Sequence, residues 1–283
     1  MTPAPSGRRP LVMGVLNVTP DSFSDGGLYD TFGRAVAHGI AMAEEGADVI
    51  DVGGESSRPG AAPVTRDVEL ARVVPVIEAL AAAPAIAGRG VRLSIDTVKP
   101  DVAAAAVAAG ASLVNDISAS LWEVAAATGA GWVAMHMRGQ PRTMQDDPRY
   151  DDVVAEVRGF VLDRALQARR AGVAEVWVDP GIGFGKTMEH NLALLRHLGE
   201  LVEAADSAGL DGVLVGASRK RFLGLLAAAP TATGATTTPA PMEDRVAGSL
   251  AAAAAALVAG AGMIRVHDVA ATVQVARLYG PAA

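Results

Sequence analysis

Basic side chains are spaced along the chain in a way that suits binding of a phosphate or diphosphate group. Arg265 and His267 lie two residues apart in an apolar segment typical of a strand, so both side chains project to the same face and can hold several phosphate oxygens. The run Ser218–Lys220 follows another such segment and opens a helix, whose first backbone N–H groups favour an anion. Arg58 lies in a Gly/Pro-rich loop from which it can close on a ligand. Any one of these cations alone indicates only a solvated charge, but the group predicts an anion site.

Two carboxylates and an amide form a second group. Asp96 and Asp179 end apolar segments that are expected to be buried strands, where an unpaired charge is costly. Asn115 ends a third such segment and offers both a hydrogen-bond donor and an acceptor. A heteroaromatic ring with several N–H donors would satisfy this set, which favours a pterin or purine pocket. The alternative is that Asp96 and Asp179 only cap the loops that follow them.

Two glycine-containing motifs have residues that suit phosphate binding or gating. Gly181–Thr187 (GIGFGKT) resembles a P-loop, but that motif needs a glycine five positions before its last glycine, where this chain has Pro180. A P-loop phosphotransferase is therefore disfavoured. The polar run Asp21–Gly27 (DSFSDGG) indicates either a lid over the site or a cluster of turn residues.

The elements that must position these residues alternate between strand and helix patterns. Apolar runs without strict polar alternation are typical of strands buried on both faces. We expect strands at 11–18, 48–53, 91–97, 112–117, 131–137, 175–179, 212–217 and 262–267. Ala-rich segments with Arg and Glu on one side predict helices at 32–45, 67–80, 100–109, 121–128, 152–171, 188–205, 220–227, 243–259 and 270–279.

Eight strand–helix repeats in about 270 residues predict a single-domain α/β fold, the (β/α)8 TIM barrel. A doubly wound open sheet is the alternative. We expect a tail over residues 1–10 and the barrel over 11–280. The carboxyl ends of barrel strands all face one side, which carries the active site. The polar residues that end or follow the expected strands are Asn17, Asp96, Asn115, His136, Asp179, Ser218, Arg265 and His267.

Composition excludes several classes of protein. The 24 basic and 31 acidic residues give a net charge of −7, which argues against a nucleic-acid binder. The absence of Cys removes disulfides, thiolate metal sites and cysteine nucleophiles.

One apolar stretch, Val246–Ile264, nearly has the length of a membrane span. It is mostly Ala and Gly, so a buried helix that runs into a strand is favoured. Its small residues would also suit a subunit contact. A cytoplasmic location without membrane contact is expected.

Seven motifs run in order from the first expected strand to the last. They are Asn17–Gly27 (NVTPDSFSDGG), Asp51–Ala61 (DVGGESSRPGA), Ser94–Thr97 (SIDT), Asn115–Ser118 (NDIS), Asp179–Thr187 (DPGIGFGKT), Gly216–Phe222 (GASRKRF) and Arg265–Asp268 (RVHD). Together they resemble the dihydropteroate synthase family of folate biosynthesis, the target of sulfonamides. The resemblance implies a TIM barrel, a homodimer and a Mg²⁺ requirement. It also implies condensation of 6-hydroxymethyl-7,8-dihydropterin diphosphate with 4-aminobenzoate to 7,8-dihydropteroate and diphosphate.

The resemblance further implies roles for individual residues. The residues expected at the pterin are Asp96, Asn115, Ile117, Met135, Asp179, Phe184 and Lys220. Those expected at the diphosphate are Asn17, Ser57, Arg58, Arg265 and His267, with Asn17 also a ligand of Mg²⁺. Those expected at the aminobenzoate are Phe23, Arg58, Pro59, Phe184, Ser218 and Lys220. Asp96, Lys220 and Arg58 are the expected catalytic residues.

Two alternatives share the pterin pocket. A non-catalytic pterin-binding relative would lose the aminobenzoate side, yet Ser218 and Lys220 are present. A pterin-dependent methyltransferase would need no diphosphate clamp, yet Arg58, Arg265 and His267 are present.

Overall fold

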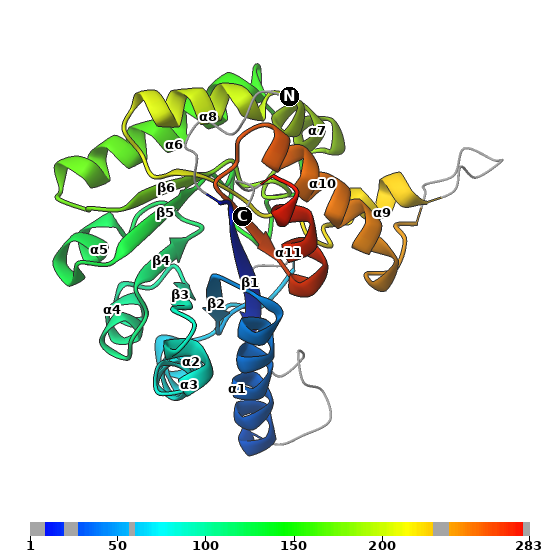
Figure 1. Cartoon of the computed structure of the whole chain (residues 1–283). Helices are drawn as coiled ribbons and strands as arrows, with labels where there is room; N and C mark the ends of the chain where they lie inside the picture. The colour runs from blue at the N-terminus through cyan, green and yellow to red at the C-terminus, as the bar shows by residue number, and fades with distance from the viewer. Residues whose placement is uncertain (1–8, 20–27, 57–59, 229–237, 280–283) are drawn as a thin grey trace.

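Eight parallel strands pair in sequence order, and the last strand pairs with the first, which closes a barrel. The computed structural model describes residues 9–19, 28–56, 60–228 and 238–279 (Figure 1). The strands are β1 (Leu11–Asn17), β2 (Val49–Gly53), β3 (Arg92–Asp96), β4 (Leu113–Asp116), β5 (Gly131–Met135), β6 (Val176–Asp179), β7 (Gly212–Val215) and β8 (Met263–Val266). All eight lie within the segments expected from the sequence, and the TIM-barrel prediction is confirmed.

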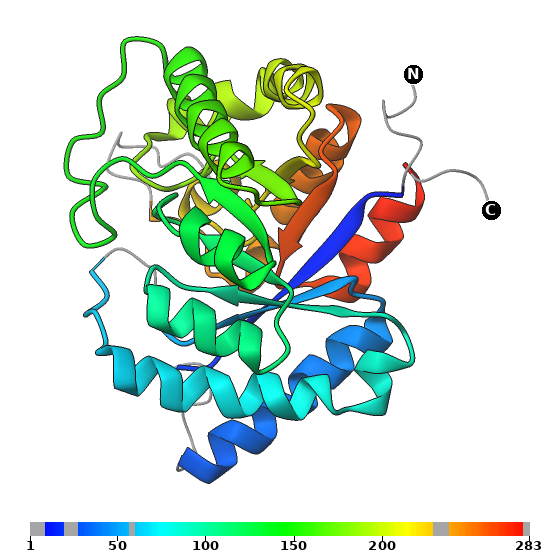
Figure 2. The same cartoon turned by 90° about the vertical axis from the view of Figure 1, so that its left-hand side faces the viewer.

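Helices cover the outside of the barrel, as the side view in Figure 2 shows. They are α1 (Leu28–Glu45), α2 (Arg66–Ala81), α3 (Pro84–Ala87), α4 (Pro100–Ala108), α5 (Trp122–Thr128), α6 (Val153–Arg170), α7 (Met188–Arg196), α8 (Leu198–Ser207), α9 (Arg221–Ala227), α10 (Val246–Val258) and α11 (Val269–Arg277). A short 3₁₀ turn, Glu243–Arg245, precedes α10.

Apart from shifted helix ends, such as the start of α1 at Leu28 and the 3₁₀ turn before α10, two features of the helical layer differ from the sequence prediction. The helix expected over 188–205 is broken at His197, whose backbone (φ −104°, ψ 19°) ends α7 and begins α8. Gly199, a weak helix former, lies two residues after the break. The single turn α3 was not predicted, because four residues are too few to show a helical period.

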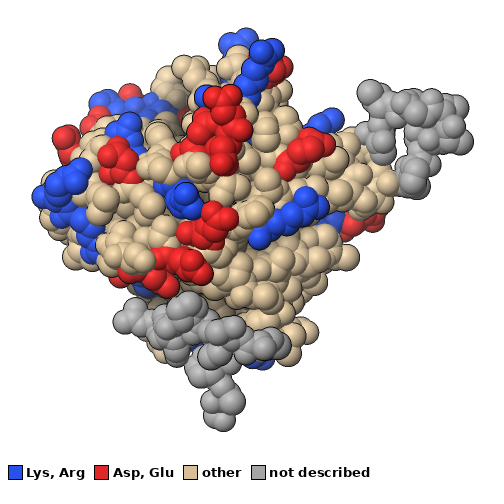
Figure 3. Space-filling view, turned by 90° about the horizontal axis from the view of Figure 1, so that it is seen from above, with Lys and Arg blue, Asp and Glu red and all other residues tan. Residues whose placement is uncertain are grey.

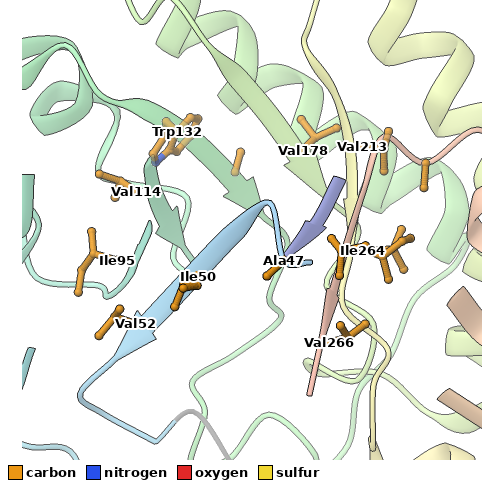
Figure 4. Packing of buried hydrophobic residues seen from close by; sticks show 14 of the residues in the cluster. Ala47, Ile50, Val52, Ile95, Val114, Trp132, Val178, Val213, Ile264 and Val266 are labelled. Carbon is orange, nitrogen blue, oxygen red and sulfur yellow. The ribbon is translucent and has the colours of Figure 1, made fainter. Parts of the chain in front are cut away.

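Side chains along each strand alternate between the outside and the inside of the barrel. The outer set, which includes Ile50, Ile95 and Val178 (Figure 4), packs with helix residues in one large buried cluster. The inner set forms a separate cluster that fills the interior. Its members are Met13, Val49, Leu113, Val133, Trp177, Leu214 and Met263.

The barrel interior changes from apolar to polar along the strands. On four strands, the next inward-facing residue after the apolar layer is polar. Asp51 follows Val49, Asn115 follows Leu113, Asp179 follows Trp177 and Arg265 follows Met263, each two residues later. Because the strands are parallel and closed, all four meet at the carboxyl end of one barrel.

The long apolar stretch Val246–Ile264 forms α10 and the first two residues of β8, as the sequence favoured. Within the described residues, no helix has both the length and the apolar character needed to cross a bilayer.

The inner cluster leads to a prediction about stability. Leu113 is fully buried in this cluster, whereas Leu278, after α11, is 74% exposed. We expect Leu113→Ala to lower the free energy of unfolding by about 2–5 kcal/mol, because the barrel cannot collapse around the cavity. The matched change Leu278→Ala is expected to stay within about 0.5 kcal/mol of wild type. Urea unfolding followed by circular dichroism measures both, and equal losses would contradict the prediction.

Candidate active site

A charged network spans the polar end of the barrel interior. Arg265, on β8, donates from Nε to Asp51 Oδ2 at 2.6 Å and from Nη2 to Asp96 Oδ2 at 2.7 Å. Asn115, on β4, donates from Nδ2 to the same Asp51 oxygen at 2.8 Å. Four strands therefore meet through one guanidinium, one amide and two carboxylates. The pairing also shows that Asp96 already has a counter-ion from the protein.

The protonation of this network depends on its burial. Burial raises the pKa of Asp96 to about 7, although the Arg265 guanidinium opposes the change. For Arg265, burial acts to lower the pKa, but Asp51 and Asp96 outweigh it and the pKa is raised, so Arg265 stays charged. The network thus combines a fixed positive charge with a carboxyl group that can gain or lose a proton near neutral pH.

Two buried oxygens beside the network make no hydrogen bond within the described part of the chain. They are Asp51 Oδ1 and Ser94 Oγ, on neighbouring strands that place the two residues in register. Buried polar atoms are rarely left unpaired in native proteins. These two oxygens are therefore unusual, and they lie in the barrel interior beside the bonds that Asp51 accepts from Arg265 and Asn115.

The connection between β6 and α7 forms one wall of the site and follows an unusual path. Gly181 has φ +64°, and a Cβ there would lie 1.8 Å from the carbonyl oxygen of His136. Only glycine tolerates this approach. Five successive backbone carbonyls, from residue 181 to 185, each accept a hydrogen bond from a side chain. The donors are Lys186, Lys220, Gln145, Lys186 again and Tyr150.

Lys220 lies on this wall. Its ammonium donates to the carbonyl of Ile182, and Nζ is 4.5 Å from the centroid of the Phe184 ring. Burial lowers the pKa of Lys220 to about 8, against the opposing charge of Asp179. Asp179 accepts a hydrogen bond from the Gly181 amide at 2.7 Å. Burial raises the pKa of Asp179, and Lys220 is the largest influence that opposes this.

Lys186 lies beneath the same wall and does not face a ligand. Its ammonium is 2.9 Å from His136 Nδ1 and donates to the carbonyls of Gly181 at 3.0 Å and Phe184 at 3.1 Å. Burial is the main cause that lowers the pKa of Lys186 to about 7 and that of His136 to about 3. His136 therefore accepts from Lys186 as a neutral ring. The lysine of the GIGFGKT motif supports the loop, consistent with the rejection of a P-loop.

The turn after β7 is tied to the end of β8. Ser218 Oγ accepts from the His267 amide at 3.2 Å and is 3.1 Å from His267 Nδ1. Arg219, which the sequence grouped with the anion-binding residues, instead forms a two-point ion pair with Asp268 at 3.0 and 2.5 Å. Its backbone is left-handed (φ +56°). Adjacency in the sequence could not reveal the pairing of Arg219 with Asp268.

The structure brings most of the predicted site residues to one end of the barrel. Asn17 ends β1, where a Cβ on Gly53 would lie 3.7 Å from Asn17 Oδ1 and 3.5 Å from Asp96 Cβ. Ile117 and Met135 are buried directly after β4 and at the end of β5. The predicted residues Phe23, Ser57, Arg58 and Pro59 lie outside the described residues.

Sequence reasoning named the motif that contains Asp51 but gave this residue no role. The available signal was an acidic residue inside the otherwise apolar run VIDVG, where burial demands a partner. Ser94 gives a weaker signal of the same kind, because it is a polar residue in the middle of the strand segment RLSID.

Comparisons with known proteins agree in pointing to one family. The model of a family described as pterin binding enzyme matches residues 13–267. Dihydropteroate synthase of Escherichia coli (strain K12) is 44% identical over 276 residues, which cover 95% of this chain and 90% of the relative. The crystal structure of Yersinia pestis dihydropteroate synthase with a sulfonamide drug is 44% identical, has a TM-score of 0.82 and is matched over 96% of this chain and 93% of that one. Dihydropteroate synthase from Xanthomonas albilineans in complex with 7,8-dihydropteroate is 43% identical, with a TM-score of 0.77 over 97% and 94% of the two chains.

The raised pKa of Asp96 makes the stability of the fold depend on pH. This carboxyl group titrates at about pH 7 in the folded protein, against about 3.9 in an unfolded chain. The folded state holds the proton more tightly, so the stabilisation is complete below about pH 4 and is lost as the pH rises to about 7. We expect the free energy of unfolding to fall across this range, by at most about 1.4 kcal/mol per pH unit, and to fall less in Asp96→Asn.

Urea unfolding at several pH values between about 4.5 and 7.5 measures this dependence. The control is Asp206→Asn, which changes an exposed aspartate on α8 and is expected to keep the wild-type slope. A slope that Asp96→Asn leaves unchanged would contradict the assignment.

Proposed function

This chain belongs to the family of pterin binding enzymes, and from that premise we propose how its residues divide the family's reaction among them. The chain condenses 6-hydroxymethyl-7,8-dihydropterin diphosphate with 4-aminobenzoate, giving 7,8-dihydropteroate and diphosphate. The observation that carries this function is the polar layer inside the barrel, where Asp51, Asp96, Asn115 and Asp179 lie beside two fixed cations, Lys220 and Arg265.

The pterin ring would bind against the acidic and amide groups. Its ring nitrogens and amino group carry N–H donors, which suit Asp96, Asp179 and the acceptor oxygen of Asn115. Lys220 would exchange its hydrogen bond with the Ile182 carbonyl for a pterin acceptor. The burial that lowers its pKa to about 8 favours this exchange, because a desolvated ammonium gains more from a new partner. Ile117, Met135 and Phe184 would pack against the ring.

The diphosphate would bind toward β8 and β1. Arg265 keeps its Nη1 group free of hydrogen bonds to described residues, so it can donate to a phosphate oxygen without leaving Asp51 or Asp96. His267, Asn17, Ser57 and Arg58 would complete this half of the site. As the C–O bond breaks, negative charge grows on the departing diphosphate, and these positively charged and hydrogen-bonding groups would stabilise it. Asp96 would stabilise the cationic pterin methylene that remains.

A magnesium ion would join this half through the substrate. Within the described residues, no group of three His, Asp or Glu side chains could hold a metal. Mg²⁺ commonly uses one or two protein oxygens together with substrate phosphates, and the Asn17 amide oxygen beside Gly53 fits that pattern. When bound, the ion would supply further charge neutralisation of the leaving diphosphate.

The aminobenzoate would bind at the outer edge of the site. Ser218, held by His267, and Lys220 would face its carboxylate, with Phe184 beside its ring. Phe23, Arg58 and Pro59 are proposed to complete this wall, and sulfonamides would compete for it. The arylamine is a weak base and attacks the methylene directly, so orientation is the main requirement and no protein nucleophile is needed.

A homodimer is proposed to form through an apolar groove on the outer surface. The groove has a volume of about 350 Å³ and lies where α10 contacts α7 and α9 (Figure 1). Leu192, Phe222, Leu226 and Ala251 are among its lining residues, and Leu226 is 52% exposed. The small residues of α10 allow close approach of a second copy.

A nucleic-acid partner is not expected, since acidic and basic side chains are interspersed on the face in Figure 3. The cytoplasmic location stays a prediction.

The activity is tested by measuring diphosphate release and dihydropteroate formation with each substrate omitted in turn. We expect both products only when pterin diphosphate, 4-aminobenzoate and Mg²⁺ are all present. Lys220→Met is expected to weaken pterin binding by about 1.5–3 kcal/mol, or roughly 10- to 150-fold in Kd, because a charged hydrogen bond is lost.

The matched control is Arg221→Met, which removes a neighbouring exposed cation. It is expected to bind pterin like wild type. A folded wild-type protein that bound pterin but made no dihydropteroate would support a non-catalytic relative. Unchanged affinity in Lys220→Met would exclude its pterin role.

The dimer is tested by Leu226→Asp, which places a charge in the apolar groove. We expect sedimentation to show a dimer for wild type and at least about tenfold weaker association for the variant, because burial of an unpaired carboxylate is costly. Leu278→Asp, another exposed leucine outside the groove, is the control. A monomeric wild type, or equal association in both variants, would show that this surface is not the interface.

A further inference from the structure

One buried cation beside the site has no role in the proposed reaction. Lys186 is only 2% exposed, and its ammonium group has three N–H donors. They face three acceptors, which are His136 Nδ1 at 2.9 Å, the Gly181 carbonyl at 3.0 Å and the Phe184 carbonyl at 3.1 Å. The protein therefore uses every donor of this group, so Lys186 can act on a substrate only through the residues that it holds.

The backbone that Lys186 holds is rich in glycine. In the wall segment, residues 181–185, the three glycines have left-handed backbones with φ of +64°, +83° and +63°. Glycine permits many other conformations at each of these positions, so the composition of the segment does not fix its path. Within the segment, the Phe184 amide donates to the Gly181 carbonyl at 3.1 Å. Lys186 binds the carbonyls at both ends of this turn, and it thereby helps to select one conformation.

The same wall segment supplies the surroundings of Lys220. The Lys220 ammonium donates to the Ile182 carbonyl and lies 4.5 Å from the centroid of the Phe184 ring. Its aliphatic stem packs on Gly183, where a Cβ would lie 2.9 Å from Lys220 Cδ. All three contacts fall on residues from the first to the last carbonyl that Lys186 holds. A shift of the segment would therefore displace the Phe184 ring and the partners of Lys220 together.

His136 connects this arrangement to the barrel. It directly follows Met135, the last residue of β5, and its amide donates to the Asp179 carbonyl of β6 at 3.0 Å. Its ring meets the Phe160 ring of α6 edge to face, with 5.1 Å between the centroids. Two strands and a helix thus fix the imidazole, which offers Nδ1 to Lys186 from a defined position.

We propose that Lys186 is a positioning residue for the pterin half of the substrate. It ties the wall segment to His136 and so holds Phe184 and Lys220 where the pterin ring binds. This inference rests on the proposed function, because it requires the pterin to bind against these two side chains. Lys186 does not touch the substrate, and the diphosphate side of the site, which is built on Arg265, does not depend on it.

The test compares a ligand that reaches the wall segment with one that does not. Pterin diphosphate and inorganic diphosphate are titrated by calorimetry into wild type and Lys186→Met. We expect the variant to bind pterin diphosphate about 10- to 100-fold more weakly, the scale of a misplaced binding group, and to bind inorganic diphosphate within about twofold of wild type. The control is Arg196→Met, which removes an exposed cation from α7 and should leave both affinities unchanged.

A double-variant cycle tests whether Lys186 acts through Lys220. Lys186→Met should cost much less pterin diphosphate affinity in a Lys220→Met background than in wild type, because one of the groups that it positions is already absent. Equal costs in the two backgrounds would contradict the proposal.

Two changes at His136 keep the proposal testable if Lys186→Met does not fold. His136→Asn keeps an acceptor near the position of Nδ1, whereas His136→Leu removes it. We expect His136→Leu to weaken pterin diphosphate binding by about 3- to 10-fold, the scale of one hydrogen bond, and His136→Asn to retain most of the affinity. A purely structural role of the ring would make the two variants alike, since both lose its contact with Phe160.

Two further results would overturn the proposal. One is wild-type affinity for pterin diphosphate in folded Lys186→Met, and the other is an equal loss for both ligands, which would indicate a general effect on the fold. Failure of the proposed function is recognised separately, since wild type would then make no dihydropteroate.

Discussion

The site depends on one buried guanidinium. Arg265 enters the barrel interior from β8 and is held there by Asp51 from β2 and Asp96 from β3. A single charge in this position would be strongly disfavoured, and so would either carboxylate without the arginine. In the closed barrel, β8, β2 and β3 come together at one point, so each of these buried charges has a partner of opposite sign. Closure of the sheet is therefore a requirement of the chemistry, because an open sheet in the same strand order would place β8 far from β2 and β3.

The polar layer in turn requires the apolar layer beneath it. Met13, Val49, Leu113, Trp177 and Met263 fill the interior and exclude water from below. Low water content strengthens the interactions above this layer and also shifts their protonation. The raised pKa of Asp96 and the lowered pKa of Lys220 have burial as their largest cause. The alternation that points core side chains into the barrel therefore also points the polar side chains of the site inward, two residues further along each strand.

The sequence predicted the barrel and much of the site because both depend on local patterns. A strand buried on both faces is recognisable from its apolar run, and a polar residue at its end is visible directly. Pairing across the barrel leaves no local signal. Arg265 was expected to face only an anion, since nothing near it in sequence shows that Asp51 lies beside it. Arg219 was grouped with Ser218 and Lys220 because left-handed geometry at a non-glycine residue cannot be read from residue type. His136 was noted as a polar strand end, but its pairing with Lys186 crosses 50 residues.

The arrangement of charges explains how the two halves of the proposed reaction can be coupled. One guanidinium neutralises Asp51 and Asp96 and still offers Nη1 toward the departing diphosphate. As the leaving group gains charge, Nη1 of Arg265 would donate to it while Nε and Nη2 keep their bonds to Asp51 and Asp96. Asp96 would stabilise the positive charge that develops on the pterin at the same moment. Each charge that the reaction creates thus meets an opposite charge already fixed in the barrel, so little reorganisation is needed. In the proposed reaction, Arg265 would therefore lie between the departing diphosphate and the carboxylate that faces the pterin cation.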